Sequence, residues 1–405
     1  MLYKRKIIDE ILKFIKLEEI IVLHGARQVG KTHILLWLEN YLKNKKEDVY
    51  YLDLEDSRYK KILDLGVDEF INHLKEEGHA PQIHKKTFVF IDEIQYLKNP
   101  SEFLKLIADH HKNIKLIISG SSSFEIKNKF KDSLVGRTIN FEIFNLSFEE
   151  YLIFKNYYYN PDFKTTEKKQ KELKLLYKEY ILFGGYPKVT LIDEIELKEK
   201  RLQQIIDTYI KKDIKELANI DNIESFNKLL EILASQSGQL INVKELSSTC
   251  KLSVPTIEKY LFILEQTYII KLVRPYNKNI RSELSKIPKI FFYDSGLMQM
   301  LWLKNLQKEI IGNVFETNIF SELIKKYGRE NIYYWRTKDK KEIDFIVKNK
   351  NEITPIEVKI NFNKVNLSAI KYFLKNYKLD KYQIIGFNDY EQKSNQIYPW
   401  EIKNK

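Results

Sequence analysis

The sequence feature that most limits the fold is a glycine-containing loop between an apolar run and a helical pattern. The apolar run covers residues 20–23, and the helical pattern begins at Ile34. A strand, a Gly-x-x-x-x-Gly-Lys-Thr loop and a helix in this order form a phosphate-binding loop. Its amides point at phosphate oxygens, the lysine reaches the β- and γ-phosphates, and the threonine ligates Mg²⁺. The sequence therefore predicts a nucleotide site formed by Gly25, Ala26, Arg27, Gln28, Val29, Gly30, Lys31 and Thr32.

A second apolar run ends in two acidic residues. Residues 87–91 are β-branched or aromatic, and Asp92 and Glu93 follow them. Such a run is typical of a central parallel strand, and ligands of open α/β sheets bind at the carboxyl ends of these strands. We therefore expect Asp92 to hold the Mg²⁺ water shell and Glu93 to polarise the water that attacks the γ-phosphate. The alternative is a solvated acidic pair at a strand end.

Two further candidates lie next to later strands. A strand predicted over 114–118 ends in a Ser/Gly-rich segment, where Ser119 or Ser121 would orient the attacking water. A flexible turn is the alternative there. Arg137 precedes a short strand over 139–144. An arginine that reaches a neighbour's γ-phosphate stabilises transition-state charge, and a surface salt bridge is the competing interpretation.

Together these residues resemble those of an AAA+ ATPase. They are most similar to the archaeal and bacterial ATPases that carry a C-terminal domain of unknown function, a group close to the signal-transducing STAND ATPases. The resemblance implies ATP and Mg²⁺ as ligands, hydrolysis by Asp92 and Glu93, Ser119 as a sensor, and a homo-oligomer. It also places Pro187 in a lid near the base, where Lys188 stands in place of the usual arginine. The matching stretches are 25–32, 91–95, 119–122, 136–137, 146–150 and 184–187.

The positive charge is concentrated in the last third of the chain. Residues 271–405 hold 26 Lys and Arg against 15 Asp and Glu, and the formal charge of the whole chain is +12. A local basic excess indicates a polyanionic partner such as DNA, and a genome-wide bias towards lysine is the alternative. The single cysteine, Cys250, excludes a disulfide framework. No uncharged apolar run reaches about 18 residues and no signal-peptide core appears, so we expect a cytoplasmic protein with no membrane partner.

The pattern of strands and helices divides the first 300 residues into three expected domains. Residues 1–150 alternate strands and helices, which indicates a parallel-sheet ATPase core. Residues 151–215 form a helical lid, with its hinge expected at Gly184. Residues 216–300 are typical of a winged helix-turn-helix, whose second helix, 255–266, carries one Lys and two Glu. Because base-reading helices usually carry more Arg, Lys or Asn, we expect this helix to be a scaffold or a protein contact.

The last expected domain, residues 301–405, holds a second acidic constellation. Asp344 lies on one predicted strand, and Glu357 and Lys359 lie on the next, with a turn near residue 350. Because strand side chains alternate, Glu357 and Lys359 share a face and converge with Asp344. The pattern resembles the PD-(D/E)xK nuclease core, with Glu316 from the preceding helix as an extra ligand. We expect the carboxylates to hold Mg²⁺ and Lys359 to stabilise the attacking hydroxide or the phosphorane, and the alternative is a solvated edge hairpin.

The sequence thus favours an α/β protein of the AAA+ ATPase class with a lid, a winged helix and a nuclease-like C-terminal domain. In this interpretation the nucleotide state controls a DNA-binding domain, and whether that domain cleaves DNA is left open. A nucleotide-switched regulator or signalling protein that binds a partner without cleavage is the first alternative. An ATP-driven remodeller of protein assemblies is the second.

Overall fold

The computed structural model of the chain describes residues 2–79, 86–120, 134–160, 165–214, 219–220, 222–277, 287–390 and 393–402. The chain divides into two compact units. The first comprises Met1–Asn145 and Gln266–Tyr268, and the second comprises Leu146–Glu265 and Ile269–Lys405. The first stretch of the first unit ends at Asn145, near the predicted boundary at residue 150, and most of the other three predicted domains lies in the second unit. The boundaries between those three domains stay predictions. Across the described ranges, no helix has the length and apolar content that crossing a membrane requires.

The first unit is built on a parallel sheet. Its strands are β1 (Ile20–His24), β2 (Asp48–Asp53), β3 (Thr87–Asp92), β4 (Ile114–Gly120) and β5 (Thr138–Glu142). They lie in the order β2-β3-β4-β1-β5, and every neighbouring pair is parallel. The apolar runs that predicted β3 and β4 are buried along their whole length, as central strands require. This order places the carboxyl end of β4 between those of β1 and β3.

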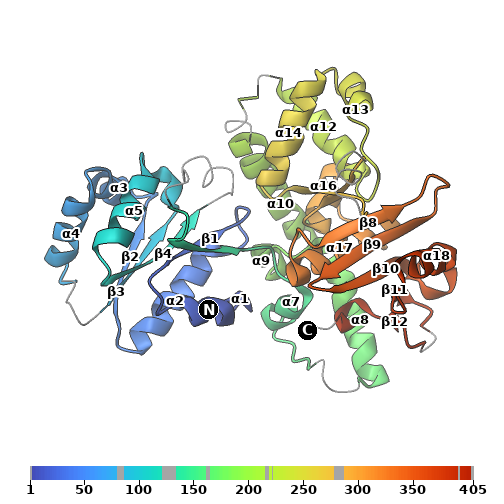
Figure 1. Cartoon of the computed structure of the whole chain (residues 1–405), viewed down its shortest axis with the longest axis horizontal. Helices are drawn as coiled ribbons and strands as arrows, with labels where there is room; N and C mark the ends of the chain where they lie inside the picture. Colours follow the sequence, from blue (N-terminus) through green and yellow to red (C-terminus); the bar gives the residue numbers. More distant parts are fainter. Residues whose placement is uncertain are drawn as a thin grey trace. The chain divides into compact units, whose positions relative to one another are not determined.

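Helices cover both faces of this sheet (Figure 1). They are α1 (Ile7–Phe14), α2 (Lys31–Asn44), α3 (Ser57–Asp64), α4 (Val67–Glu76) and α5 (Pro100–His110), with a short 3-10 helix η1 (Ile94–Tyr96). On one face, Leu63 of α3, Phe70 of α4 and Leu104 of α5 join a single core with side chains from β1, β3 and β4. On the other face, α2 packs against β2, β3 and β4. The sheet is therefore held between two helical layers.

A buried lysine at the amino end of β4 binds the segment that joins α1 to β1. Lys115, on β4, is 1% exposed, and its ammonium group donates to the carbonyl oxygens of Phe14, Leu17 and Glu19. These carbonyls lie at the end of α1 and in the loop that leads to β1. Burial lowers the pKa of Lys115 to about 8.

The pKa of Lys115 predicts a pH dependence of stability. The folded chain releases this proton near pH 8, whereas an unfolded chain keeps its lysine protons to about pH 10.4. Between these values the unfolded state binds more protons, so raising the pH stabilises the folded state. When the pH is raised from about 7.5 to about 9.5, the free energy of unfolding of the parent should increase by about 1–2 kcal/mol more than that of Lys115→Met. Urea unfolding measures both values. The parent and Lys115→Met share all their other titrating groups. If the free energy of unfolding changed equally with pH in the two proteins, the prediction would be contradicted.

The second unit begins with helices and a short antiparallel strand pair. The elements are α7 (Phe148–Phe154), α8 (Glu167–Phe183), α9 (Pro187–Thr190), α10 (Ile195–Ile205), η3 (Ile206–Ile214), α12 (Ile223–Ser235), α13 (Val243–Cys250), α14 (Val254–Gln266), β6 (Ile270–Val273), β7 (Lys289–Phe292) and α16 (Ser295–Leu303). The helices α12, α13 and α14 followed by the pair β6–β7 agree in order with the sequence pattern. Their assignment as a winged helix stays a prediction.

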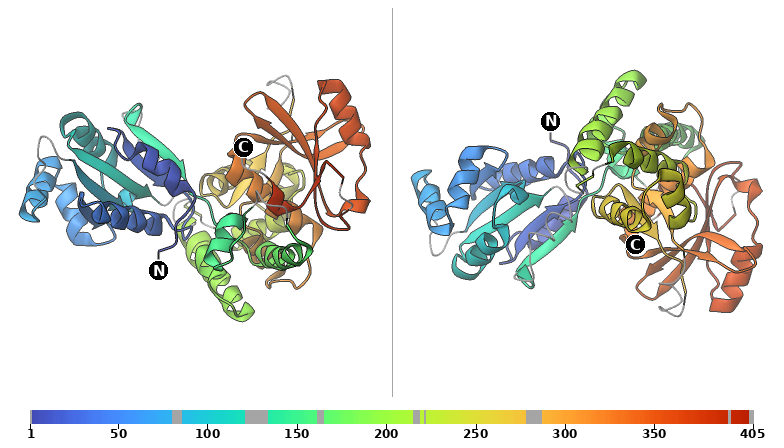
Figure 2. Two further views of the ribbon diagram at one scale, coloured as in Figure 1. Left: turned by 90° about the horizontal axis from the view of Figure 1, so that it is seen from below. Right: turned by 90° about the horizontal axis from the view of Figure 1, so that it is seen from above.

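A mixed sheet forms the end of the chain. Its elements are α17 (Gly312–Tyr327), β8 (Ile332–Arg336), β9 (Glu342–Asn349), β10 (Glu352–Asn361), η4 (Phe362–Lys364), α18 (Ser368–Tyr377), β11 (Gln383–Asn388), β12 (Gln396–Ile397) and η5 (Pro399–Glu401). The strand order is β12-β11-β10-β9-β8. Figure 2 shows α18 against one face of this sheet, where Ile370 and Phe373 pack on Ile346. On the other face the rings of Phe320, on α17, and Phe345, on β9, lie 6.1 Å apart.

The hairpin between β9 and β10 turns near residue 350, as the sequence predicted. The two strands are antiparallel, and Ile356 lies opposite Phe345. One residue further along, the same register brings Asp344 opposite Glu357. The hairpin therefore aligns two carboxylates across neighbouring strands.

Gly184, where the sequence predicts a hinge, lies within the second unit and is closely packed there. Gly184 has a φ of 77°, and a Cβ there would overlap the carboxylate of Asp294. The next amide, that of Gly185, donates to Asp294 Oδ2 at 2.8 Å, and Asp294 Oδ1 accepts from Leu297 to cap α16. Glycine is needed here for close packing, and the boundary between the units falls at Asn145. A hinge at Gly184 and Gly185 stays a prediction.

Candidate functional site

The phosphate loop joins β1 to α2, as predicted. A Cβ on Gly25 would overlap the carbonyl oxygen of Ile143, which follows β5, and Gly30 has a φ of 98° at the start of α2. Both positions therefore need glycine. Lys31 is 5% exposed, and its ammonium group donates to the carbonyl oxygens of Gly25 at 3.1 Å and Ala26 at 2.8 Å. The start of the loop thus binds the lysine that follows it. Thr32 is exposed in the first turn of α2.

An arginine from the start of the chain braces this loop. Arg5 Nη1 donates to the carbonyl oxygen of Val29 at 2.8 Å, and Nη2 donates to that of Phe144 at 3.0 Å. Arg5 is 6% exposed. Sequence reasoning missed it, because no motif links an amino-terminal arginine to a loop more than twenty residues later. Within the loop, Gln28 has a φ of 63°, and its buried Oε1 has no hydrogen-bond partner among the described residues.

The predicted metal ligand and the predicted sensor are in direct contact. Asp92 ends β3 and is 2% exposed, and Ser119 Oγ on β4 donates a short hydrogen bond to Asp92 Oδ1. The Tyr51 hydroxyl, on β2, donates to Asp92 Oδ2 at 3.1 Å. Burial, followed by the charge of Asp92, raises the pKa of Tyr51, so this phenol stays a donor. Tyr51 was not predicted, and Ser121 lies outside the described residues.

Glu93 lies beside this pair in an unusual backbone conformation. Its φ is 55°, in the left-handed region, and its amide donates to Ser119 Oγ at 3.3 Å. The Gln95 side chain donates a short hydrogen bond to Glu93 Oε2. Burial raises the pKa of Glu93, against the opposing effect of Lys31. A carboxylate with raised proton affinity, held beside the predicted metal ligand Asp92, is suited to act as a general base.

Arg137 lies at the opposite end of the sheet from the phosphate loop. Its carbonyl oxygen accepts from the amide of Ile20, the first residue of β1, at 2.8 Å. Its guanidinium binds Asp109 at 2.7 Å and 3.1 Å. Within one chain, Arg137 therefore lies at the amino end of β1 and the loop at its carboxyl end. A role for Arg137 at a nucleotide stays a prediction about a neighbouring subunit.

Pro187, predicted near the base, begins α9 in the second unit. Its position relative to the nucleotide stays a prediction.

The second predicted constellation comes together in the second unit. Lys359 Nζ lies 3.2 Å from Asp344 Oδ2 and 2.8 Å from Glu357 Oε1. The amide of Val358 donates to the same Asp344 oxygen at 2.8 Å, which ties β9 to β10. Burial, followed by the charge of Asp344, raises the pKa of Glu357 to about 7. Despite burial, Asp344 and Glu357 raise the pKa of Lys359, so the ammonium stays charged.

A second lysine completes this group and was not predicted. Lys289, on β7, is 3% exposed, and its amine lies 2.6 Å from Glu342 Oε1 and 3.7 Å from Glu316 Oε1. Burial, followed by the charge of Asp344, raises the pKa of Glu316 to about 8. We call these six residues the C-terminal charged cluster: Lys289, Glu316, Glu342, Asp344, Glu357 and Lys359.

The carboxylates of this cluster are paired with lysines. Within the described ranges, no group of three or more His, Cys, Asp or Glu side chains is arranged to hold a metal ion. Carboxylate oxygens are suitable donors for Mg²⁺, but a cation here would compete with Lys289 and Lys359 for them. The metal-ligand roles of Glu316, Asp344 and Glu357 stay predictions.

A parallel sheet with a phosphate loop after β1 and an Asp-Glu pair after β3 defines a P-loop protein of the AAA+ ATPase class. Residues 17–152 match the family described as AAA domain, residues 174–309 match Domain of unknown function (DUF8612), and residues 311–404 match Domain of unknown function (DUF4143). The chain belongs to the family of the Uncharacterized protein MJ1544 of Methanocaldococcus jannaschii. It is 31% identical to that protein over 402 residues, which cover 95% of this chain and 86% of the relative. An Uncharacterized protein of Haemophilus influenzae is 27% identical over 388 residues, which cover 93% of this chain and 92% of that protein.

Two solved structures show a weak likeness. AMPPCP-bound DnaA from Aquifex aeolicus is 17% identical, with a TM-score of 0.29 over 64% of this chain and 86% of that one. Cdc6p from Pyrobaculum aerophilum is 14% identical, with a TM-score of 0.32 over 71% of this chain and 91% of that one. At these TM-scores the likeness carries no argument about this chain.

Proposed function

We propose that the chain hydrolyses ATP at the phosphate loop, with Mg²⁺ held beside Asp92 and Glu93 acting as the general base. The observation that carries this proposal is the grouping of Lys31, Asp92, Ser119 and Glu93 at the carboxyl ends of β1, β4 and β3. Lys31 would neutralise the β- and γ-phosphates, and the exposed Thr32 hydroxyl and Asp92 would hold the metal. Ser119 donates to Asp92 and accepts from the Glu93 amide, so it fixes the positions of both acids.

Nucleotide titration and phosphate release on the full chain test this proposal. The parent protein should bind a fluorescent ATP analogue and release phosphate only when Mg²⁺ is present. In Lys31→Ala, a charged hydrogen-bond donor to the phosphates is lost, which should weaken binding by about 10- to 100-fold. Failure of the parent protein to bind ATP would refute the proposal.

Arg137 should act on the nucleotide of a neighbouring subunit if the chain forms an oligomer. Arg137→Ala and Lys31→Ala proteins should then each have little activity, and a mixture should recover up to about a quarter of the parental rate, because some interfaces regain both residues. Arg58→Ala, which removes an exposed arginine paired with Asp56, should keep parental activity. If the variants assemble together but the mixture never exceeds the ATPase rate of either variant alone, Arg137 has only a structural role through its ion pair with Asp109.

A DNA-directed activity of the second unit is the second candidate. It is favoured by the meeting of Asp344, Glu357 and Lys359 on one hairpin and by the basic excess of residues 271–405. Binding through phosphate contacts should have little sequence preference and should weaken steeply with salt. If a metal joins the carboxylates, it would bring a water to the phosphorus and offset charge on the leaving oxygen.

Incubation of the full chain with DNA distinguishes the nuclease hypothesis from the regulator hypothesis. Single-stranded, duplex and branched DNA should be tested with Mg²⁺ or Mn²⁺, with and without ATP. A nuclease should cleave in the parent, lose cleavage in Glu357→Ala, and keep its ATPase rate in that variant. A regulator that binds a partner without cutting should leave every substrate intact while still binding ATP. Cleavage that persists in Glu357→Ala would rule out the cluster as the site.

A further inference from the structure

One tyrosine of the first unit comes from a distant part of the sequence. Residues Gln266–Tyr268 belong to the first unit, although α14 before them and β6 after them belong to the second. Tyr268 is 3% exposed and has a φ of 60°, in the left-handed region. A non-glycine residue in this region costs about 1–2 kcal/mol, and such strain persists only where surrounding contacts impose it. Here the left-handed residue follows the end of α14, and the amide of Ile269 bonds back to the carbonyl oxygen of Leu264, as at a helix C-cap.

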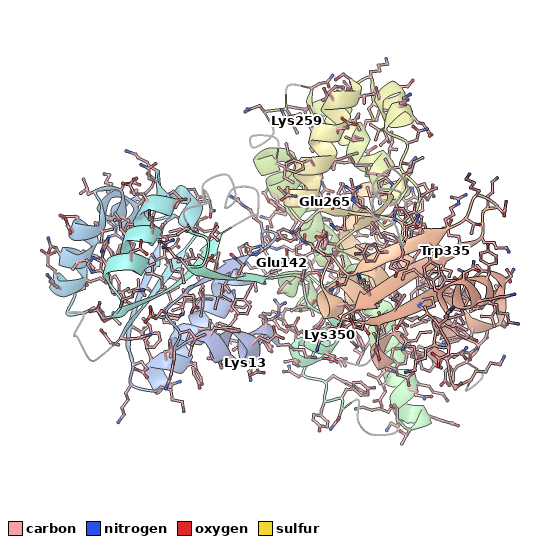
Figure 3. The ribbon with its side chains drawn as sticks, in the orientation of Figure 1. Lys13, Glu142, Lys259, Glu265, Trp335 and Lys350 are labelled. Atoms are coloured by element: carbon pink, nitrogen blue, oxygen red, sulfur yellow. The ribbon has the colours of Figure 1, made fainter. Side chains whose placement is uncertain are left out.

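The Tyr268 hydroxyl joins the ends of two strands beside the loop. It lies 2.8 Å from His24 Nδ1, on the last residue of β1, and it donates to Glu142 Oε1, on the last residue of β5, at 3.1 Å. Figure 3 labels Glu142 at this strand end. The Tyr268 ring also packs edge-on against Phe144, with ring centres 6.1 Å apart. Loss of this hydroxyl would remove the hydrogen bonds to both strand ends at once.

His24 transmits its position directly to the phosphate loop. It precedes Gly25, and its carbonyl oxygen accepts from the amide of Ile143 at 2.7 Å. The carbonyl of Ile143 in turn fills the space where a Cβ of Gly25 would lie. The backbone between His24 and Gly25 is thus held against the end of β5.

On the other side, Tyr268 is joined to two elements of the second unit. The next residue, Ile269, donates through its amide to Leu264 in the last turn of α14, at 3.0 Å. The carbonyl oxygen of Ile269 accepts from the amide of Tyr293, just after β7, at 3.2 Å. A change at Tyr268 therefore reaches α14 and the β6–β7 pair through one peptide bond.

We propose that Tyr268 is a positioning residue, whose hydroxyl couples nucleotide occupancy of the phosphate loop to the segment from α14 to β6. The proposal rests on nucleotide binding at the loop, as proposed above. By holding His24 and Glu142, Tyr268 fixes the start of the loop before the phosphates arrive. Bound phosphates draw the loop amides towards themselves, and the clamped His24–Gly25 backbone carries this shift to Tyr268.

Hydrogen exchange and steady-state kinetics of the full-length Tyr268→Phe protein test this coupling. In the parent protein, a non-hydrolysable ATP analogue should slow amide exchange across residues 254–273. Tyr268→Phe should lose most of that change and should raise the KM for ATP by about 3- to 10-fold, the equivalent of one neutral hydrogen bond, with kcat within about 2-fold. Tyr158→Phe, at a tyrosine that is 78% exposed, should match the parent in every measurement.

Variants of Glu142 provide a second, conservative test. Glu142→Gln keeps a hydrogen-bond acceptor and should retain the exchange response, whereas Glu142→Ala should lose it as Tyr268→Phe does. If Tyr268→Phe lowers the melting temperature but keeps the full exchange response and the parental KM, the contact is structural only and the proposal is overturned. If the parent protein itself fails to bind ATP, the proposed function fails, and this is seen before any variant is compared.

Discussion

Replacing Glu93 by glutamine should reduce ATP turnover by about 100- to 1,000-fold and leave nucleotide affinity nearly unchanged. The amide cannot accept a proton from the attacking water, but it fills the same space and can still accept from Gln95. Asp92, Ser119 and Lys31 keep their contacts, so phosphates and metal are still held. Phosphate release measures the turnover, and titration with a fluorescent ATP analogue measures the affinity.

Two comparisons make the Glu93→Gln result specific. Lys31→Ala should lose affinity as well as turnover, which separates failure of binding from failure of chemistry. Glu55→Gln, which alters an exposed carboxylate after β2, should behave as the parent does. Hydrolysis in Glu93→Gln at the parental rate would remove Glu93 from the mechanism and leave the base unidentified.

Replacing Lys289 by alanine should destabilise the second unit by about 3 kcal/mol or more. This lysine is 3% exposed, and its ammonium is the closest cation that the structure places beside Glu342, with Glu316 on its other side. Without it, Glu316 loses the ammonium group 3.7 Å away, and Glu342 is left with Arg336, whose Nη1 lies 3.5 Å from Glu342 Oε2. A urea titration or a thermal scan of the full chain would show the loss as a lower urea midpoint or a lower melting temperature.

The matched control is a lysine pair on the surface. Lys304 binds Glu231, and the two side chains are 59% and 48% exposed. Lys304→Ala should cost no more than about 1 kcal/mol, since water screens such a pair. Equal unfolding of Lys289→Ala and Lys304→Ala would mean that Glu316 and Glu342 do not depend on the buried amine.

The parts of the fold that sequence reasoning found are those with a local signal. Continuous apolar runs located β1, β3 and β4, and the strand alternation of residues 342–359 located the hairpin that aligns Asp344 with Glu357. The edge strand β2 was not among the predicted strands. Its alternation of buried and half-exposed residues is interrupted by two adjacent tyrosines, and both of its ends are aspartates.

The parts that were missed depend on contacts between distant residues. Arg5, Tyr51 and Tyr268 each meet the nucleotide site through a partner more than twenty residues away, so no spacing rule could find them. Lys289 precedes three apolar residues, and nothing local shows that Glu342 compensates its burial. Arg137 is different: a residue that precedes a parallel strand lies at the amino edge of the sheet, and that signal was available in the sequence.

The C-terminal charged cluster is one of several sets of contacts that join two sequence domains. Lys289 belongs to the span matched as DUF8612, and the four carboxylates belong to the span matched as DUF4143. A recombination event that replaced one of these spans would leave Glu316 and Glu342 without the lysine that pairs with them, or leave that lysine buried without the glutamates. The two spans should therefore be inherited as a pair, and a chimaera that takes one of them from a distant relative should fold only if the lysine and its glutamates come from the same parent.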